Sequence, residues 1–176
     1  MKKYFALIGL ALLLVTNASF AQEKINWISI QQAEKLNTTQ PRKVLIDCYT
    51  EWCGWCKRMD ATTFSDPSIV KYINENYYAV KFDAEQKDTV IFKNFTFINP
   101  DPANSRSTHQ FAVSLLNGQL GYPTMVFLDE QFGILTPLAG FVQAPDLMPI
   151  LHFFKADAQK TTTYEEFKKQ WDLNKK

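Results

Sequence analysis

Residues 44–57 read Val-Leu-Ile-Asp-Cys-Tyr-Thr-Glu-Trp-Cys-Gly-Trp-Cys-Lys, and this stretch decides the fold. Its first six residues form a mostly apolar run with β-branched members, which predicts a buried strand over 44–49. The Cys-Gly-Trp-Cys turn follows at once, and a helix is expected from there to about Thr63. A reactive turn between the end of a strand and the start of a helix lies where α/β sheets place their chemistry.

The chain has three cysteines, and their spacing favours redox chemistry over structural cross-linking. Cys53 and Cys56 are separated by only two residues, so a disulfide between them closes too small a loop to stabilise the fold much. The same spacing lets one sulfur attack a mixed disulfide formed on the other. Cys48 lies in the apolar strand and is expected to be a small buried hydrophobic residue, with a regulatory or alternative thiol role as the other reading.

The two close cysteines are expected to have different roles. Cys53 should begin the helix, where unpaired N–H groups and the helix dipole favour a thiolate, so it should be the attacking thiol. Its pKa should fall from about 8.5 toward neutrality. Cys56 lies one turn into the helix, is expected to be more shielded, and should resolve the mixed disulfide.

Outward from this stretch, the chain alternates helices and strands as an α/β protein does. The alternation in residues 90–97 predicts a small hairpin that turns at Lys93-Asn94 and has one apolar face, which includes Phe95. Residues 99–107 are expected to form a loop. Apolar periodicity and turn residues predict helices over 30–36, 67–74, 107–116, 145–154 and 164–173, and strands over 78–83, 124–129 and 135–139. This order indicates a mixed sheet flanked by helices in a single domain.

Residues 44–57 closely resemble the active-site segment of thioredoxins, and further matches follow in order along the chain. These matches are Asp47 six residues before Cys53, Lys57 after the second cysteine, Lys81 in the next strand, the segment Gly121-Tyr122-Pro123-Thr124, and Gly140 after the last strand. The resemblance covers roughly residues 26–154. It implies a thioredoxin fold, with a central mixed β-sheet flanked by helices, and the activity of a protein-disulfide oxidoreductase.

The resemblance also implies roles for the residues around the cysteines. Pro123 is expected to follow a cis peptide bond, and the backbone of Tyr122 to pair with an extended segment of the substrate. Asp47 is a carboxylate in an apolar strand, so burial should raise its pKa. The resemblance makes Asp47 a proton shuttle for Cys56, and the alternative is a structural partner for Lys81. The expected catalytic residues are Cys53, Cys56, Asp47 and Pro123, and the expected substrate-binding residues are Trp52, Gly54, Trp55 and Tyr122.

Two features depart from ordinary thioredoxins. Trp55 stands where thioredoxins have proline, and the insertion over residues 85–119, between the second core strand and the strand that follows Pro123, makes that connection much longer. The insertion either packs on the core or lies beside the cysteines and shapes the choice of partner. Residues 63–67 are similar to an exported subgroup that includes the periplasmic C-terminal domain of the thiol:disulfide interchange reductant carrier. This similarity favours a reductase over an oxidant or an isomerase.

The first residues predict an exported protein. Lys2 and Lys3 precede an apolar run over residues 5–15, and Ser19-Phe20-Ala21 supplies small residues for a signal peptidase. This pattern predicts a signal peptide over 1–21, because a spanning helix needs about 20 apolar residues; an uncleaved anchor is the alternative. The domain is then expected over 22–176, with a final helix at about 163–173. It should be periplasmic or secreted, without stable membrane insertion.

Composition and ligand spacing restrict the remaining functions. With 19 basic and 18 acidic side chains the net charge is +1, which offers no electrostatic case for nucleic acid. No cofactor or metal is expected, because zinc would need two ligands more than the close cysteines supply. The expected partners are protein thiols and disulfides, with a membrane electron donor as a further candidate. The alternative functions are a copper-binding module and a non-catalytic peptide-binding module, which metal analysis and a thiol-exchange assay would reveal.

Overall fold

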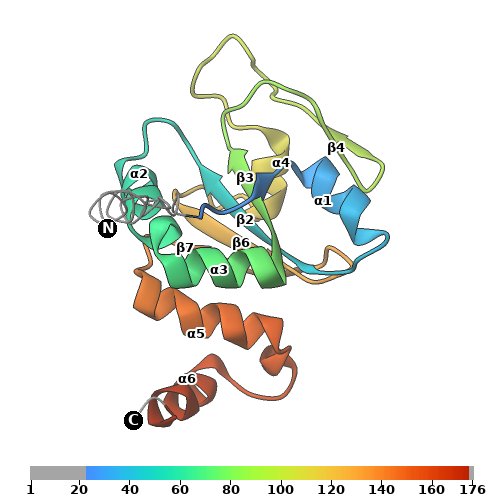
Figure 1. Ribbon diagram of the computed structural model, residues 1–176. Coiled ribbons are helices and arrows are strands. Elements are labelled where there is room, and N and C mark those ends of the chain that lie inside the picture. The colour runs from blue at the N-terminus through green and yellow to red at the C-terminus, as the bar shows by residue number, and fades with distance from the viewer. Residues whose placement is uncertain (1–22, 175–176) are drawn as a thin grey trace, which may run out of the picture.

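The computed structural model describes residues 23–174 and has a five-stranded mixed sheet at its centre (Figure 1). The predicted signal peptide over 1–21 lies outside the described residues. The strands stand in the order β1-β3-β2-β6-β7, with β1 at Trp27–Ile28, β2 at Lys43–Tyr49, β3 at Tyr77–Asp83, β6 at Thr124–Leu128 and β7 at Ile134–Ala139. The central strand, β2, pairs in parallel with β3 and antiparallel with β6.

Helices cover both faces of the sheet (Figure 1). One face carries α1 (Ile30–Asn37), α4 (Gln110–Leu115) and a hairpin of β4 (Val90–Phe92) and β5 (Phe95–Phe97). The other face carries α2 (Gly54–Ala61), α3 (Pro67–Asn76) and α5 (Ala144–Lys155), and α6 (Tyr164–Leu173) packs on α5. Between residues 23 and 174, no helix is both long and apolar enough to cross a membrane. The predicted mixed sheet flanked by helices is confirmed.

The apolar run of β2 is continuous because the strand is buried on both faces. Val44, Ile46 and Cys48 belong to the core cluster under α1 and α4, whereas Leu45 belongs to the cluster under α3 and α5. Successive side chains of a strand alternate between its faces, so Asp47 falls on the same side as Leu45. One short stretch therefore supplies both halves of the core and places one carboxylate under the helices that follow the cysteines.

The first strand was not predicted from the sequence. Trp27 and Ile28 pair in parallel with Ala79 and Val80 of β3 and extend the sheet at that edge. A strand of two residues is too short to show an alternating pattern, so periodicity could not reveal it. The pairing brings Trp27 beside β3, where its ring lies near Lys81.

The hairpin turns at Lys93 and Asn94 as predicted. Both residues have positive φ, 50° and 65°, which is the backbone that a two-residue hairpin turn requires. Phe92 is buried and packs on the ring of Phe111 with centroids 5.4 Å apart. Phe95, in contrast, is 68% exposed, so the prediction of one continuous apolar face was wrong for this residue. The buried ring of Phe111 is already covered by Phe92 and by Phe97, which lies in β5 farther from the turn.

Much of the insertion over residues 85–119 is part of the core. Phe111 is buried and packs edge to face on Phe82 of β3. His109, inside the helix predicted over 107–116, is buried and caps α4: its Nδ1 accepts the backbone N–H of Phe111 at 3.1 Å. Its Nε2 then donates to the carbonyl of Asp88 at 3.0 Å. The hairpin and α4 therefore pack on the core, as one of the two readings of the insertion predicts. The loop between them spans residues 98–109.

Lys43, at the start of β2, is a buried cation held by two carboxylates. Its Nζ lies 2.9 Å from Glu130 Oε1 and 2.8 Å from Asp157 Oδ1. These contacts tie the central strand to the turn after β6 and to the end of α5. The hydrogen bond from Lys43 lowers the pKa of Asp157 to about 2.

Replacing Lys43 by methionine should lower the free energy of unfolding by about 1–2 kcal/mol near neutral pH. The loss is moderate because both carboxylates are partly exposed and water solvates them when the cation is gone. The contribution of Asp157 is present above its ordinary pKa of 3.8 and is lost as the pH falls toward 2. Urea unfolding of K43M should therefore approach that of the wild type in acid.

The matched control is K169M, which removes an exposed lysine from α6. This variant should change the unfolding free energy little at either pH, because a solvated lysine loses few contacts. A deficit of K43M that stays constant between neutral pH and about pH 3 would contradict the ion-pair explanation and indicate a packing effect instead.

Candidate active site

The two close cysteines lie at the N-terminus of α2, directly after β2. Cys53 is the N-cap residue, and its Sγ accepts a hydrogen bond from the backbone N–H of Cys56 at 3.0 Å. The two sulfurs form a disulfide, with Cα atoms 5.3 Å apart. The first turn of a helix has N–H groups without partners in the helix, so in the reduced protein they favour a thiolate at Cys53.

The sulfur pair is shielded, whereas the residues around it are exposed. Cys53 is 5% exposed and Cys56 is 2% exposed, in the predicted order. Trp52 and Trp55 are 51% and 56% exposed. Gly54 is also exposed, and a Cβ at its position would meet no atom within 4 Å. The surface around the sulfurs is therefore formed by two indole rings and a glycine without a side chain.

A second segment meets this surface just before β6. The peptide bond between Tyr122 and Pro123 is cis, as predicted. Thr124 pairs with Cys48 across β2 and β6, so the two preceding residues lie beyond the strand end from which the reactive turn begins. The rings of Tyr122 and Trp52 meet edge to face with centroids 6.3 Å apart. Four of the predicted site residues are thereby gathered at one end of the sheet, namely Trp52, Cys53, Tyr122 and Pro123.

Asp47 and Lys81 form a buried ion pair between neighbouring strands. They are partners in the β2–β3 register, and Lys81 Nζ donates to Asp47 Oδ2 at 2.8 Å. Burial raises the pKa of Asp47, and the positive charge of Lys81 offsets only part of this effect. The other oxygen, Oδ1, is buried without a hydrogen-bond partner in the described part of the chain. Such a carboxyl keeps its proton to higher pH than an exposed one, which suits proton transfer.

Asp60 is a second carboxylate on Lys81, and the sequence analysis missed it. Lys81 Nζ forms ion pairs with both Asp60 and Asp47. Burial alone would lower the pKa of Lys81, but the two carboxylates raise it. The available signal was the spacing of four residues between Cys56 and Asp60, since residues four apart share one face of a helix.

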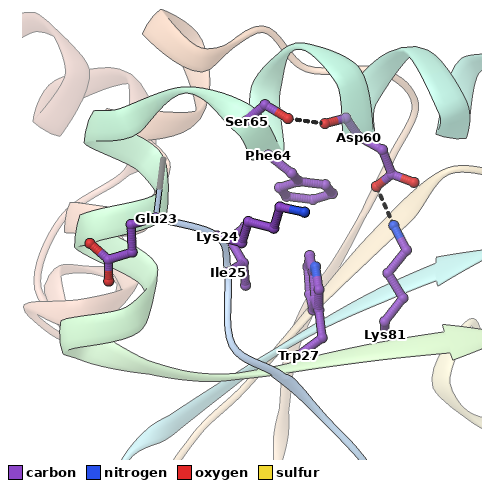
Figure 2. A pocket seen from close by; sticks show the side chains of 8 residues that line it. All are labelled: Glu23, Lys24, Ile25, Trp27, Asp60, Phe64, Ser65 and Lys81. Atoms are coloured by element: carbon purple, nitrogen blue, oxygen red, sulfur yellow. Dashed lines mark hydrogen bonds and ion pairs between the residues drawn. The ribbon is translucent and has the colours of Figure 1, made fainter. Parts of the chain in front are cut away.

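A pocket of about 390 Å³ opens onto Asp60 and Lys81. Figure 2 shows the side chains that line it. Trp27 and Phe64 form its apolar walls, and Asp60 and Lys81 lie at one side. Lys81 Nζ is 5.2 Å from the ring centre of Trp27 and 5.5 Å from that of Phe64. Solvent therefore reaches Lys81 and Asp60, although Asp47 behind them is buried.

Cys48 is completely buried, so the prediction of a shielded cysteine is confirmed. Burial also raises the pKa of its thiol. In the reduced, folded protein, a mild alkylating agent should therefore label Cys48 about a hundredfold more slowly than Cys53, because the thiolate is the reacting form. Mass spectrometry of the labelled peptides measures both rates, and labelling in urea, where the rates should converge, is the control. Equal labelling of the folded protein would instead put Cys48 at the surface.

Comparison with known proteins identifies the family. The family model of the thioredoxin-like domain matches residues 30–155. The thiol:disulfide interchange protein DsbD of Escherichia coli (strain K12) is 28% identical over 122 residues, which cover 66% of this chain and 18% of that protein. DsbD of Haemophilus ducreyi is 27% identical over 139 residues, which cover 78% of this chain and 21% of that protein. The chain thus spans about a fifth of the length of these curated relatives.

A solved structure confirms the fold. A thioredoxin from Thermus thermophilus superposes with a TM-score of 0.54 at 18% identity, covering 73% of this chain and 85% of that chain. The family match extends over most of the described residues and includes the Cys53–Cys56 pair at the start of α2. This chain therefore belongs to the thioredoxin-like family of disulfide oxidoreductases.

Proposed function

We propose that this protein reduces disulfides of other proteins outside the cytoplasm, through the dithiol of Cys53 and Cys56. The observation that carries the proposal is the position of Cys53 Sγ at the N-terminus of α2, within 3.0 Å of the backbone N–H of Cys56. A thiolate is favoured there, and the second thiol is one helical turn away. The exposed tryptophans and the segment before Pro123 supply a surface for the partner.

The first step is the attack of the Cys53 thiolate on one sulfur of a partner disulfide. A new S–S bond joins Cys53 to the partner, the S–S bond of the partner breaks, and its second sulfur leaves as a thiolate that takes a proton from water. The backbone N–H and C=O of Tyr122 pair with the extended segment around the partner cysteine. The partner lies across Trp52, Gly54 and Trp55.

The second step is the attack of Cys56 on the mixed disulfide. The Cys56 thiol loses its proton, its sulfur bonds to the sulfur of Cys53, and the remaining partner sulfur leaves as a thiolate. The partner has then gained two electrons, and the Cys53–Cys56 pair has lost them. Asp47 acts as the base for Cys56, because its buried carboxyl has a raised pKa and an oxygen without another partner. Lys81 and Asp60 link this carboxyl to the pocket beside Trp27.

Each cycle leaves the protein oxidised, so a reductant has to restore the dithiol. A membrane electron donor is the proposed source, because the curated relatives include a thiol:disulfide interchange protein. Export is proposed from the basic start and the apolar run over residues 5–15. N-terminal sequencing of the protein from its host should then begin at Gln22. A chain that retains Met1 in the membrane fraction would support the uncleaved anchor.

The reduction potential of the Cys53–Cys56 couple tests the proposed direction. The purified protein is equilibrated with glutathione buffers, and the dithiol fraction is measured by thiol trapping. A potential below about −230 mV, more reducing than glutaredoxins, supports a reductase, whereas a value near about −120 mV would make the protein an oxidant. A reduced protein that does not accelerate the reduction of insulin disulfides would overturn the proposed function itself.

A further inference from the structure

The insertion over residues 85–119 contributes two side chains to the surface beside Cys53. The carboxylate of Glu85 accepts the indole Nε1–H of Trp52 at 2.9 Å. The guanidinium of Arg106 lies over the face of the same ring, with Cζ 4.5 Å from its centre. The hairpin lies elsewhere, against α1, where the backbone N–H of Lys93 donates to the carboxylate of Glu34. The two connections that flank the hairpin, and not the hairpin itself, are therefore the parts of the insertion that reach the reactive turn.

The guanidinium of Arg106 forms no ion pair within the described chain. It is exposed, and no ion pair over residues 23–174 includes it. A guanidinium stacked on an aromatic ring is held in position by that ring, while the N–H groups along its edge stay available for hydrogen bonds. Arg106 thus offers a positioned donor group on the ring of Trp52, the residue that directly precedes Cys53.

The other side of the disulfide has a similar arrangement. The guanidinium of Arg58 lies 5.3 Å from the ring centre of Trp55 and 5.5 Å from that of Phe141. Arg58 is also exposed and takes part in no ion pair of the described chain. Each exposed tryptophan beside the cysteine pair therefore carries an arginine that forms no ion pair in the described chain.

Carboxylates also line the groove beside Trp52, and there they outnumber the cations. Glu85 already accepts the indole N–H of Trp52, and Asp83 accepts the backbone N–H of Glu85 at 3.0 Å. Glu51 also lines the groove of about 580 Å³ beside Trp52 but forms no ion pair with Arg106. These acids would repel a carboxylate elsewhere in the groove, so an acidic partner is favoured only where it meets a guanidinium.

We propose that Arg106 and Arg58 select partners with acidic side chains on both sides of the reactive cysteine. The inference rests on the proposed disulfide exchange and adds the chemical class of the partner. A planar guanidinium forms two parallel N–H···O bonds with a carboxylate, and stacking on tryptophan keeps it ready to do so. The two arginines act on the partner chain that lies across Trp52 and Trp55, and not on the sulfur chemistry.

Three disulfide-linked peptide dimers test this selection. They share one short sequence and carry glutamate, glutamine or lysine on each side of the cysteine. The reduced full-length protein is mixed with each dimer at low ionic strength, and the second-order rate constant of reduction is measured. The wild type should reduce the glutamate dimer about fivefold faster than the glutamine dimer, with the lysine dimer slowest. The preference should shrink in salt, because exposed charges are screened.

Variants assign the preference to the arginines. R106Q should lower the ratio of glutamate to glutamine rates, and R58Q/R106Q should bring it close to one. R106K keeps the charge but lacks the planar fork, so it should retain part of the preference. K169Q removes the same charge from α6 and should keep the wild-type ratio. A ratio measured within one variant is independent of how much of that variant is folded.

The outcomes separate the two proposals. Equal rates for the three dimers with an active wild type would overturn the selection and leave the proposed function intact. A glutamate preference that survives in R58Q/R106Q would also overturn the assignment to these arginines. A wild type that reduces neither the dimers nor insulin would overturn the proposed function, and the partner inference with it.

Discussion

Replacing Cys53 by serine should lower the reduction of insulin disulfides to the uncatalysed rate. Cys53 is the residue whose sulfur accepts a helix N-terminal N–H, so its loss removes the stabilised thiolate that begins the exchange. The remaining Cys56 is more deeply shielded and cannot form the internal disulfide. Turbidity of insulin follows the reaction, and C48S, which alters the buried third cysteine, is the matched control.

Replacing Cys56 by serine should have a different result. The first attack still occurs, but no second thiol resolves the product, so covalent complexes between Cys53 and its partners should accumulate. Non-reducing gels of the variant mixed with a disulfide substrate detect these complexes. Release of substrate by C56S at the wild-type rate would show that the assigned order of the two cysteines is wrong.

The second large effect is expected at Asp47. D47N should slow the release of the mixed disulfide about ten- to a hundredfold near neutral pH, because an amide cannot accept the proton of Cys56. Stopped-flow mixing with a fluorescent peptide disulfide separates this release from the first attack. D146N is the control: it makes the same change at an exposed aspartate of α5, which does not contact Lys81.

The pH dependence distinguishes proton transfer from a structural role. Burial raises the pKa of Asp47, so the wild-type release rate should rise with pH as the carboxylate forms. The release rate of D47N should not rise over the pH range in which the Asp47 carboxylate forms. At high pH it should approach the wild-type rate, because hydroxide then removes the proton of Cys56. A rate deficit that is the same at every pH would identify Asp47 as a structural partner of Lys81.

Stability should change with pH in the opposite direction. A carboxyl whose pKa is raised by folding binds its proton more tightly in the folded protein than in the unfolded chain. The resulting stabilisation is complete below the ordinary pKa and is lost as the pH rises through the folded value. Over that range the wild type should therefore lose stability relative to D47N, which urea unfolding at several pH values measures.

The positions that sequence reasoning found are those governed by neighbours along the chain. The strand over 44–49, the helix that starts at the cysteines and the turn at Lys93-Asn94 all depend on local propensity and periodicity, and all three are present. The short strand at Trp27–Ile28 escaped because two residues carry no period. Phe95 was expected in an apolar face, but the core available to the hairpin is already covered by other rings.

The side chains that reasoning missed come from distant parts of the chain. Asp60 shares Lys81 with Asp47, which the sheet register places opposite that lysine, and the charge of Asp60 also raises the pKa of Asp47. Arg106 meets Trp52 across more than fifty residues of sequence, through a loop whose polar composition indicates no particular contact. Such contacts have no short-range signal, because a loop residue is positioned by the core elements that hold both ends of its loop.

By itself, the sequence determined the chemistry of this protein. Two cysteines at helical spacing after a buried strand permit disulfide exchange. The apolar strand that contains Asp47 raises the pKa of that carboxyl, because the strand is buried. The tertiary structure alone decided the surroundings of that chemistry. Packing of the insertion on the sheet brought Arg106 onto Trp52, and pairing of β1 with β3 brought Trp27 to the pocket at Lys81. Local residue patterns specify which bonds can form, whereas the burial of distant apolar side chains specifies which groups lie beside them.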